Sequence, residues 1–242
     1  MEVLHLDYRP PTAGWVLPLQ TRLLNSTSPT LRERYSRWAE VGLSELGIAV
    51  ATRLALTFYV SRRLGVLLKQ LRDEIAASGE LDDLLAGGYV YTPQESALLY
   101  EICAAVDAFF FEFRSCYEVL GKFLQAFGHH ILDRRIAEND LLSVLSAADA
   151  DTTWIDPLRL NRILFFHNTA PWIALRIDSR VPFECSLLVM KKNLRTFDDP
   201  DDYVTQPQLV ETIEGFQIAS WKLRDWLAVQ IDEVERQTPS TA

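Results

Sequence analysis

The chain has 242 residues, of which 48% are apolar and 24% charged, and this ordinary composition excludes a globally disordered protein. A chain of this length can bury a sizeable core, as one large domain or as two small ones. The formal net charge of -9 opposes attraction of the whole chain to nucleic acid or to an anionic membrane, so binding of RNA or DNA would need a local basic face.

Three features of the sequence bear on the compartment in which the protein is found. Residues 1–7 have neither a basic flank nor an apolar run, so we expect no signal peptide. The most apolar stretch, residues 41–60, contains Glu45 and Arg53 near its middle, and we therefore predict no membrane span. The three cysteines lack the spacing of zinc or redox motifs, which fits buried thiols in a reducing compartment. We predict a cytoplasmic protein.

Ser28 marks the predicted boundary between an N-terminal arm and a helical domain. Several prolines and a glycine make residues 1–27 look irregular, so we predict an N-terminal arm there and a single helical domain over residues 28–242. Ser28-Pro29 places a hydroxyl at an N-cap and a proline at the first helical position. The helical pattern that starts there reaches about Ala77, with a candidate break near residues 42–47.

A second long helix is expected from Pro93 to about Leu132, after a loop over residues 78–91. Thr92 and Glu95 would form a capping box at its start. Apolar residues then recur in three- and four-residue steps, namely Leu99, Val106, Phe110, Phe113, Leu120 and Phe123. Because the adjacent Phe109, Phe110 and Phe111 point in different directions, we predict that the middle of this helix is buried all round, at the centre of a bundle.

Shorter elements follow. Residues 139–147 and 157–167 predict two short helices, the second capped by Asp156. The apolar period then changes to two over residues 172–178 and, more loosely, 183–189, with turn residues between them, which predicts a β-hairpin. A last helix is expected from about Gln206 to Glu235, after an acidic loop.

Together these elements predict a mainly α fold, a bundle of five to seven helices with a small β-hairpin in the C-terminal half. The predicted parts are the bundle core at 28–168, the hairpin at 169–195 and the terminal helix at 205–236.

Most catalytic motifs are missing from the sequence. There is no phosphate-binding glycine loop, no GxSxG elbow and no HExxH pair. With four histidines in all, we predict no metal site and no cofactor. His129-His130 could donate a proton or bind a ligand, but both residues also suit the negative end of the helix dipole, and we favour this structural role.

Charged residues within the second long helix are a further candidate. Glu112 and Arg114 lie in an otherwise apolar stretch, so we expect each to be paired or to face a cleft. By default Glu112 forms a structural ion pair with an arginine across the bundle, and the alternative is a role in a functional site.

The strongest chemical lead is the pair Arg162 and His167. On a helix, five positions correspond to about 140° around the axis, so the side chains meet only if the helix unwinds at His167. In a shared cleft the imidazole could take the proton from a ribose 2′-hydroxyl while the guanidinium holds the phosphate, without a metal. Alternatively, His167 and Asn168 simply cap and end the helix.

An arginine, four to six residues and a histidine at a late helix end of a helical chain resemble the motif of the HEPN superfamily. The resemblance implies a bundle that commonly dimerises, with two motifs facing each other across a shared groove. It also implies a metal-independent endoribonuclease of toxin, defence or RNA-processing systems, although other members are inactive nucleotide-binding or scaffold proteins. One departure is Ile163, where the family usually has a polar residue.

Carried over to this chain, the resemblance implies catalytic roles for Arg162 and His167, with Glu112 as the polar residue of the preceding long helix. The residues expected to contact RNA are Asn161, Asn168 and Arg114.

We therefore expect a homodimer that acts on or binds RNA. Basic residues of the first long helix and of the hairpin could form the required basic face, or could equally be paired internally. The alternative function is a non-catalytic interaction protein that dimerises or docks a protein partner. Its support is Trp221 and Trp226, which are candidate exposed aromatics on the last helix.

Overall fold

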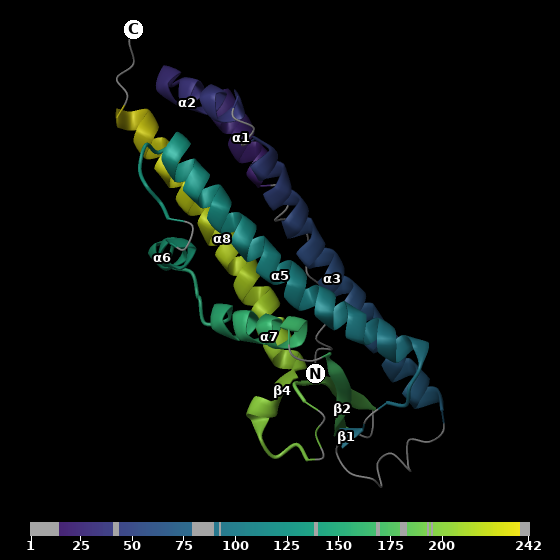
Figure 1. Cartoon of the computed structure of the whole chain (residues 1–242). Coiled ribbons are helices and arrows are strands. Elements are labelled where there is room, and N and C mark those ends of the chain that lie inside the picture. The colour runs from purple at the N-terminus through teal and green to yellow at the C-terminus, as the bar shows by residue number, and fades with distance from the viewer. Residues whose placement is uncertain are drawn as a thin grey trace. The chain divides into compact units, whose positions relative to one another are not determined.

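The structure, a computed structural model, is mainly helical with a small antiparallel sheet in the C-terminal half (Figure 1). The predicted fold class is therefore confirmed. The residues that the structure describes are 15–40, 44–78, 90–91, 93–137, 140–167, 170–179, 183–192, 194 and 196–237.

The helices lie close to the predicted positions. They are α1 (Val16–Leu24), α2 (Pro29–Glu40), α3 (Ser44–Ala77), α5 (Ala97–His130), α6 (Leu141–Ala147), α7 (Ile155–His167) and α8 (Gln206–Gln237). The strands are β1 (Val90–Tyr91), β2 (Trp172–Ser179), β3 (Glu184–Met190) and β4 (Tyr203–Thr205). A turn of 3-10 helix, Pro200–Asp202, precedes β4.

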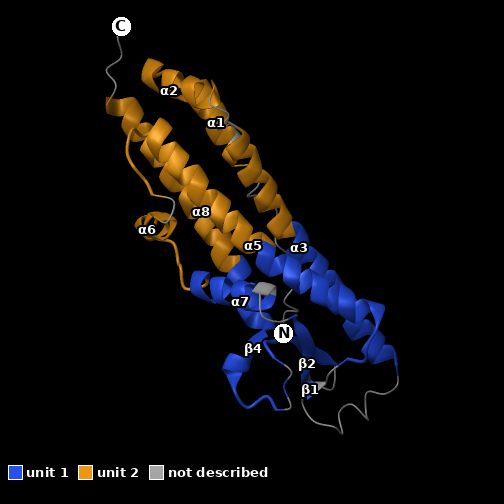
Figure 2. Cartoon of the chain, viewed as in Figure 1, with its two compact units in different colours: residues 1–8, 59–111, 155–213 blue, residues 9–58, 112–154, 214–242 orange. Residues whose placement is uncertain are grey.

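Two compact units are built from interleaved segments of the chain (Figure 2). Among the described residues, unit 1 comprises 59–111 and 155–213, and unit 2 comprises 15–58, 112–154 and 214–237. Helices α3, α5 and α8 each contribute residues to both units. Each unit has its own buried core, and the functional candidates are therefore located by unit.

Unit 2 has an aromatic core. The fully buried ring of Trp38 lies 5.8 Å from the ring of Phe123 and 6.2 Å from that of Phe127, which joins α2 to the C-terminal half of α5. Trp15 packs edge-on against Phe123 and donates its indole N–H to the hydroxyl of Ser220 on α8, at 2.9 Å. Aromatic pairs of this kind add to the free energy gained from burying apolar surface.

Helix α1 corrects the prediction of an irregular arm, because residues 16–24 are helical. Pro18 is the third residue of α1, where the backbone N–H has no intrahelical partner, so proline costs no hydrogen bond there. Burial of Leu19 and Leu23 on one side holds the helix in place. The cap predicted at Ser28 is confirmed, since its hydroxyl accepts the N–H of Leu31 at 3.4 Å.

Two other predicted caps are wrong. Helix α5 begins at Ala97 and not at Pro93, and the hydroxyl of Ser96 accepts the N–H of Leu99 at 3.1 Å, while Thr92 lies outside the described residues. Helix α7 begins at Ile155, which puts Asp156 inside its first turn. Ser96 precedes Leu98, the first buried residue of α5, by two positions. The helix starts there because burial of its inner face stabilises it.

Unit 1 has an aromatic contact that fixes α7. Phe110 of α5 is buried and stacks on Phe165 of α7, with ring centroids 5.2 Å apart. Phe109 is also buried, whereas Phe111 is 36% exposed. Asp107, one turn earlier on the same face, is exposed as well. The prediction that this helix is buried all round is therefore wrong, because positions four apart share one face, and this face meets solvent.

The predicted hairpin is confirmed and forms the centre of a larger sheet with the strand order β1-β2-β3-β4. Strands β2 and β3 pair antiparallel, with Trp172 opposite Met190 and Ile177 opposite Cys185. The outer strands β1 and β4 have two and three residues, which is too short for an alternating pattern to be visible in the sequence. Both outer strands also pair antiparallel with their neighbours.

In the part of the chain that the structure describes, no helix is by itself both long and apolar enough to cross a bilayer. Helix α2 and residues 45–77 meet the requirement only together, as a pair bent by 80°.

Substitution of Phe110 by alanine should lower the free energy of unfolding by about 3–5 kcal/mol, because it leaves a cavity beneath Phe165. Phe111→Ala is the matched control and should cost less than about 1 kcal/mol, because this ring is partly in solvent. Urea denaturation followed by circular dichroism measures both. Equal losses for the two variants would contradict the assignment of Phe110 to the core of unit 1.

Candidate functional site

Helix α7 carries the Arg162 and His167 motif and has a well-defined inner face. Leu158, Asn161 and Phe165 recur in three- and four-residue steps, and all three are buried in unit 1. Because Phe165 stacks on Phe110, the last turns of α7 are anchored to α5 next to the motif. Asn161, a predicted RNA contact, thus belongs to the inner face of the helix.

Arg162 is half-buried, at the edge of this inner face. The helix continues through His167, so any unwinding of the backbone begins after this residue. Positions 162 and 167 are therefore about 140° apart around the helix axis. The side chain of His167 and all of Asn168 lie outside the described residues, so the separation of the two catalytic candidates stays a prediction.

The outer face of α7 is apolar beside the motif. Leu160 is 58% exposed and Ile163 is 43% exposed. Ile163 is also the residue that departs from the HEPN pattern. An exposed branched side chain at this position extends an apolar strip along the helix that carries the motif, and apolar strips of this kind are typical of subunit contacts.

Glu112 is paired in unit 2. Its Oε2 accepts the Nη1 of Arg53 on α3 at 2.6 Å, and the two side chains are 15% and 33% exposed, respectively. This contact is the ion pair with an arginine of another helix that the sequence favoured. The neighbouring Cys116 is buried, and its burial raises the pKa of the thiol well above the usual range. The pair therefore closes a largely dry part of the α3–α5 contact.

Arg114 is also paired, within its own helix. Its Nε donates to Glu118 at 2.9 Å, and its guanidinium lies 5.1 Å from the ring centre of Tyr117. Both Arg114 and Glu112 belong to unit 2, whereas Arg162 belongs to unit 1. The contacts found for Glu112 and Arg114 are ion pairs between or within helices, and their expected roles in catalysis and RNA binding stay predictions.

Several basic residues of α3 and of the sheet take part in ion pairs. Arg180 and Arg195 lie outside the described residues. The pairs found are Arg63 with Glu101, Lys69 with Asp73, Arg176 with Asp178, and Lys192 with Asp202. For these residues the alternative of internal pairing holds, and they do not form an unneutralised basic face.

The tryptophans that supported an interaction surface are less accessible than expected. Trp221 and Trp226 are both half-buried on α8, next to the buried Leu223 and Leu227. The guanidinium of Arg134 covers Trp226 at 5.1 Å from its ring centre. These two side chains are therefore partly used in packing unit 2.

A pocket that the sequence did not predict lies at the C-terminal end of α5. Lys122, Gln125, Ala126 and His129 recur in three- and four-residue steps and share one face of this helix. Arg135 completes the polar part of the pocket from the following loop. The helical stripe was visible in the sequence, but the arrival of Arg135 depends on how the loop folds back.

Over the described residues there is no group of three or more histidine, cysteine or carboxylate side chains that could hold a metal ion. No family model, no curated protein and no solved structure matches the chain significantly. Functional inference therefore depends on the residues and their geometry.

Substitution of Glu112 by glutamine should destabilise the protein by about 1–3 kcal/mol, because it leaves the half-buried Arg53 without its counter-charge. Glu118→Gln is the matched control and should cost less than about 0.5 kcal/mol, because its pair with Arg114 is within one helix and more exposed. Thermal unfolding measures both variants. A Glu112→Gln protein as stable as the control would show that the Arg53 pair is not structural.

Proposed function

We propose that this protein is a HEPN-like, metal-independent endoribonuclease of a toxin or defence system, acting as a cytoplasmic homodimer. The observation that carries the proposal is the position of the motif. Arg162 and His167 lie in the last turns of α7, whose inner face is anchored by Phe165, and the strip beside them is apolar and exposed. The Phe165 contact supports the proposal because it fixes the backbone of α7 next to the motif.

The proposed reaction needs only these side chains. The neutral imidazole of His167 accepts the proton of a ribose 2′-hydroxyl, whose oxygen then attacks the adjacent phosphorus. The guanidinium of Arg162 binds the phosphate oxygens and stabilises the charge that develops on them. The bond to the 5′-oxygen breaks and this oxygen takes up a proton from an imidazolium, which restores the neutral imidazole and leaves a 2′,3′-cyclic phosphate and a 5′-hydroxyl.

A second copy of the chain supplies what one motif lacks. Because positions 162 and 167 are about 140° apart around α7, one copy does not direct both groups to the same point unless the helix end rearranges. Two copies related by a twofold axis would contribute one histidine and one arginine each to a shared groove. Leu160 and Ile163 are suited to the apolar part of that contact.

The same apolar strip also fits a second function, a non-catalytic interaction protein. In that case Leu160 and Ile163 would contact a protein partner, and His167 would end the helix without taking part in chemistry. Cleavage of RNA distinguishes the two functions, because an interaction protein has no reason to depend on His167.

The first test is His167→Ala beside wild type, with purified protein and total RNA. We expect the variant to lose cleavage while its melting temperature stays within a degree or two. Arg162→Gln should lose most activity, whereas Arg159→Gln, an exposed arginine of the same helix, is the matched control and should keep it. Wild-type cleavage should persist in EDTA, since no step uses a metal. Cleavage by His167→Ala, or loss of wild-type cleavage in EDTA, would disprove the mechanism.

The second test concerns assembly. We expect wild type to scatter light at twice the chain mass of 27.6 kDa at micromolar concentration. Leu160→Lys combined with Ile163→Lys should shift the mass to that of the monomer and abolish cleavage, because buried lysines oppose the contact. Leu142→Lys, an exposed leucine of α6, is the control and should remain dimeric. A wild-type protein that stays at 27.6 kDa on concentration would exclude the composite site.

A further inference from the structure

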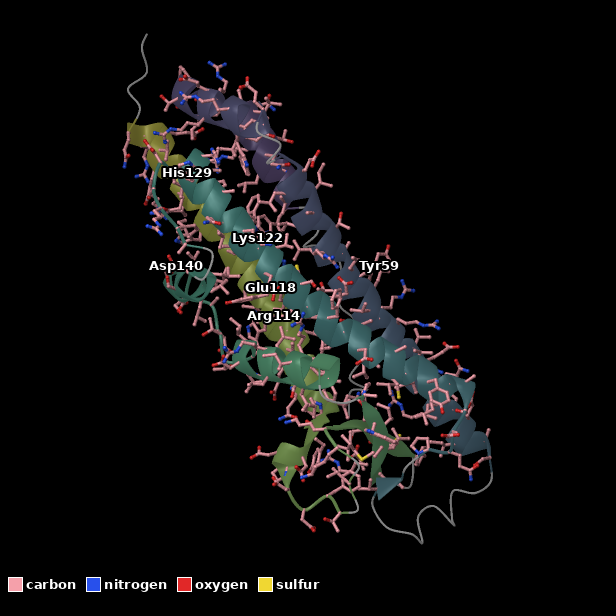
Figure 3. The ribbon with its side chains drawn as sticks, in the orientation of Figure 1. Tyr59, Arg114, Glu118, Lys122, His129 and Asp140 are labelled. Carbon is pink, nitrogen blue, oxygen red and sulfur yellow. The ribbon has the colours of Figure 1, made fainter. Side chains whose placement is uncertain are left out.

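The end of α5 in unit 2 has two faces. Phe123, Leu124 and Phe127 are buried in the core of this unit. Lys122 and His129, labelled in Figure 3, belong to the opposite stripe, and both residues line a pocket. The pocket has a volume of about 670 Å³ and is lined by Leu46, Lys122, Gln125, Ala126, His129, His130, Arg135 and Ile136. This volume lies within the range of sites for small organic ligands.

The wall opposite the helix is a loop held in place by several contacts. The N–H groups of Ile131 and Leu132 both bond to the carbonyl of Phe127, and Asp133 adopts a left-handed conformation with φ of 54°. The chain then turns back, and the N–H of Arg134 bonds to the carbonyl of Gly128 at 2.9 Å. These bonds satisfy carbonyls at the helix end, which would otherwise repel an anion.

Gly128 allows this loop to approach closely. A β-carbon at position 128 would lie 2.7 Å from the Cγ1 of Ile136 and 3.1 Å from the carbonyl oxygen of Arg134. Only glycine leaves room for Ile136 to pack on the helix. The adjacent Arg135 is thereby brought to the same pocket as Lys122, thirteen residues earlier in the chain.

The charge of the pocket is positive on an acidic protein. Of the lining residues, Lys122 and Arg135 are cations and none is a carboxylate. No ion pair to either cation is found among the residues that the structure describes. In the loop, Asp133 binds Arg34 at 3.2 Å, and Asp140 accepts the N–H of Ala137 at 2.9 Å. These two acids are therefore occupied by other partners.

The remaining lining residues define the rest of the ligand. Leu46, Ala126 and Ile136 provide apolar surface, and Gln125 offers both a donor and an acceptor. Partial burial, and then the neighbouring His129, lower the pKa of His130. An imidazole can also form hydrogen bonds, and the positive charge of the pocket comes from Lys122 and Arg135.

We propose that this pocket binds a phosphomonoester whose body has both apolar surface and a hydrogen-bonding edge, and a nucleoside 5′-monophosphate is one such compound. Arg135 would hold two phosphate oxygens with its planar guanidinium, and Lys122 would add a point charge. The body would lie against Leu46, Ala126 and Ile136, with Gln125 near its polar edge. The proposal does not depend on ribonuclease activity at α7.

Calorimetric titration of the purified protein with AMP at low salt tests the proposal. Wild type should bind one AMP per chain, and inorganic phosphate should compete. Lys122→Gln combined with Arg135→Gln should weaken AMP binding at least tenfold. Arg32→Gln, an exposed arginine of α2 outside the pocket, should change binding less than twofold. Ala126→Leu, which fills the pocket without changing its charge, should also weaken binding at least tenfold.

Oligoribonucleotides distinguish a free nucleotide from the end of an RNA. If only an oligomer with a 5′-phosphate binds, and its 5′-hydroxyl counterpart does not, the phosphomonoester is an RNA terminus. Histidine NMR of wild type provides a readout that needs no variant, because ligand should shift the signals of His129 and His130. Absence of saturable binding of both AMP and the 5′-phosphorylated oligomer at millimolar concentration, or binding that is unaffected by the double substitution and by Ala126→Leu, would overturn the proposal.

Discussion

Helix α5 must bury an aromatic face along most of its length, and both compact units depend on this burial. In unit 1, Phe110 stacks on Phe165 and thereby holds α7. In unit 2, Phe123 and Phe127 surround Trp38 and bring α2 to the same helix. Large rings contribute most of the apolar area that a small core can bury, so the elements around α5 are placed where they can cover those rings.

This constraint also decides where charged residues can act. On the inner side of α5 the carboxylate of Glu112 is only 15% exposed and has to be neutralised, which Arg53 does. A carboxylate held in such an ion pair is poorly suited to catalysis, because breaking the pair would destabilise the folded protein. Both functional proposals lie near helix ends, one at α7 and one at α5.

The two proposed sites share a physical requirement, which is to attract phosphate to an acidic protein. A net charge of -9 repels polyanions at long range, but salt screens this repulsion over about 8 Å at physiological ionic strength. Local cations then decide whether phosphate binds. Lys122 and Arg135 form such a local group in unit 2, and Arg162 is the cation offered by α7 in unit 1.

Local pattern alone determined much of the fold. The period of apolar residues predicted α8 and the β2–β3 hairpin nearly to their ends, because helix and strand periods are set by neighbouring residues. The spacing of Arg162 and His167 can also be read directly from the sequence. Only the tertiary structure decided that Glu112 pairs with Arg53, that Phe111 meets solvent, and which residues line the α5 pocket. These outcomes depend on contacts between segments that are distant in the sequence. Such contacts form where charges become paired and apolar side chains become buried, and a local pattern of residues does not encode them.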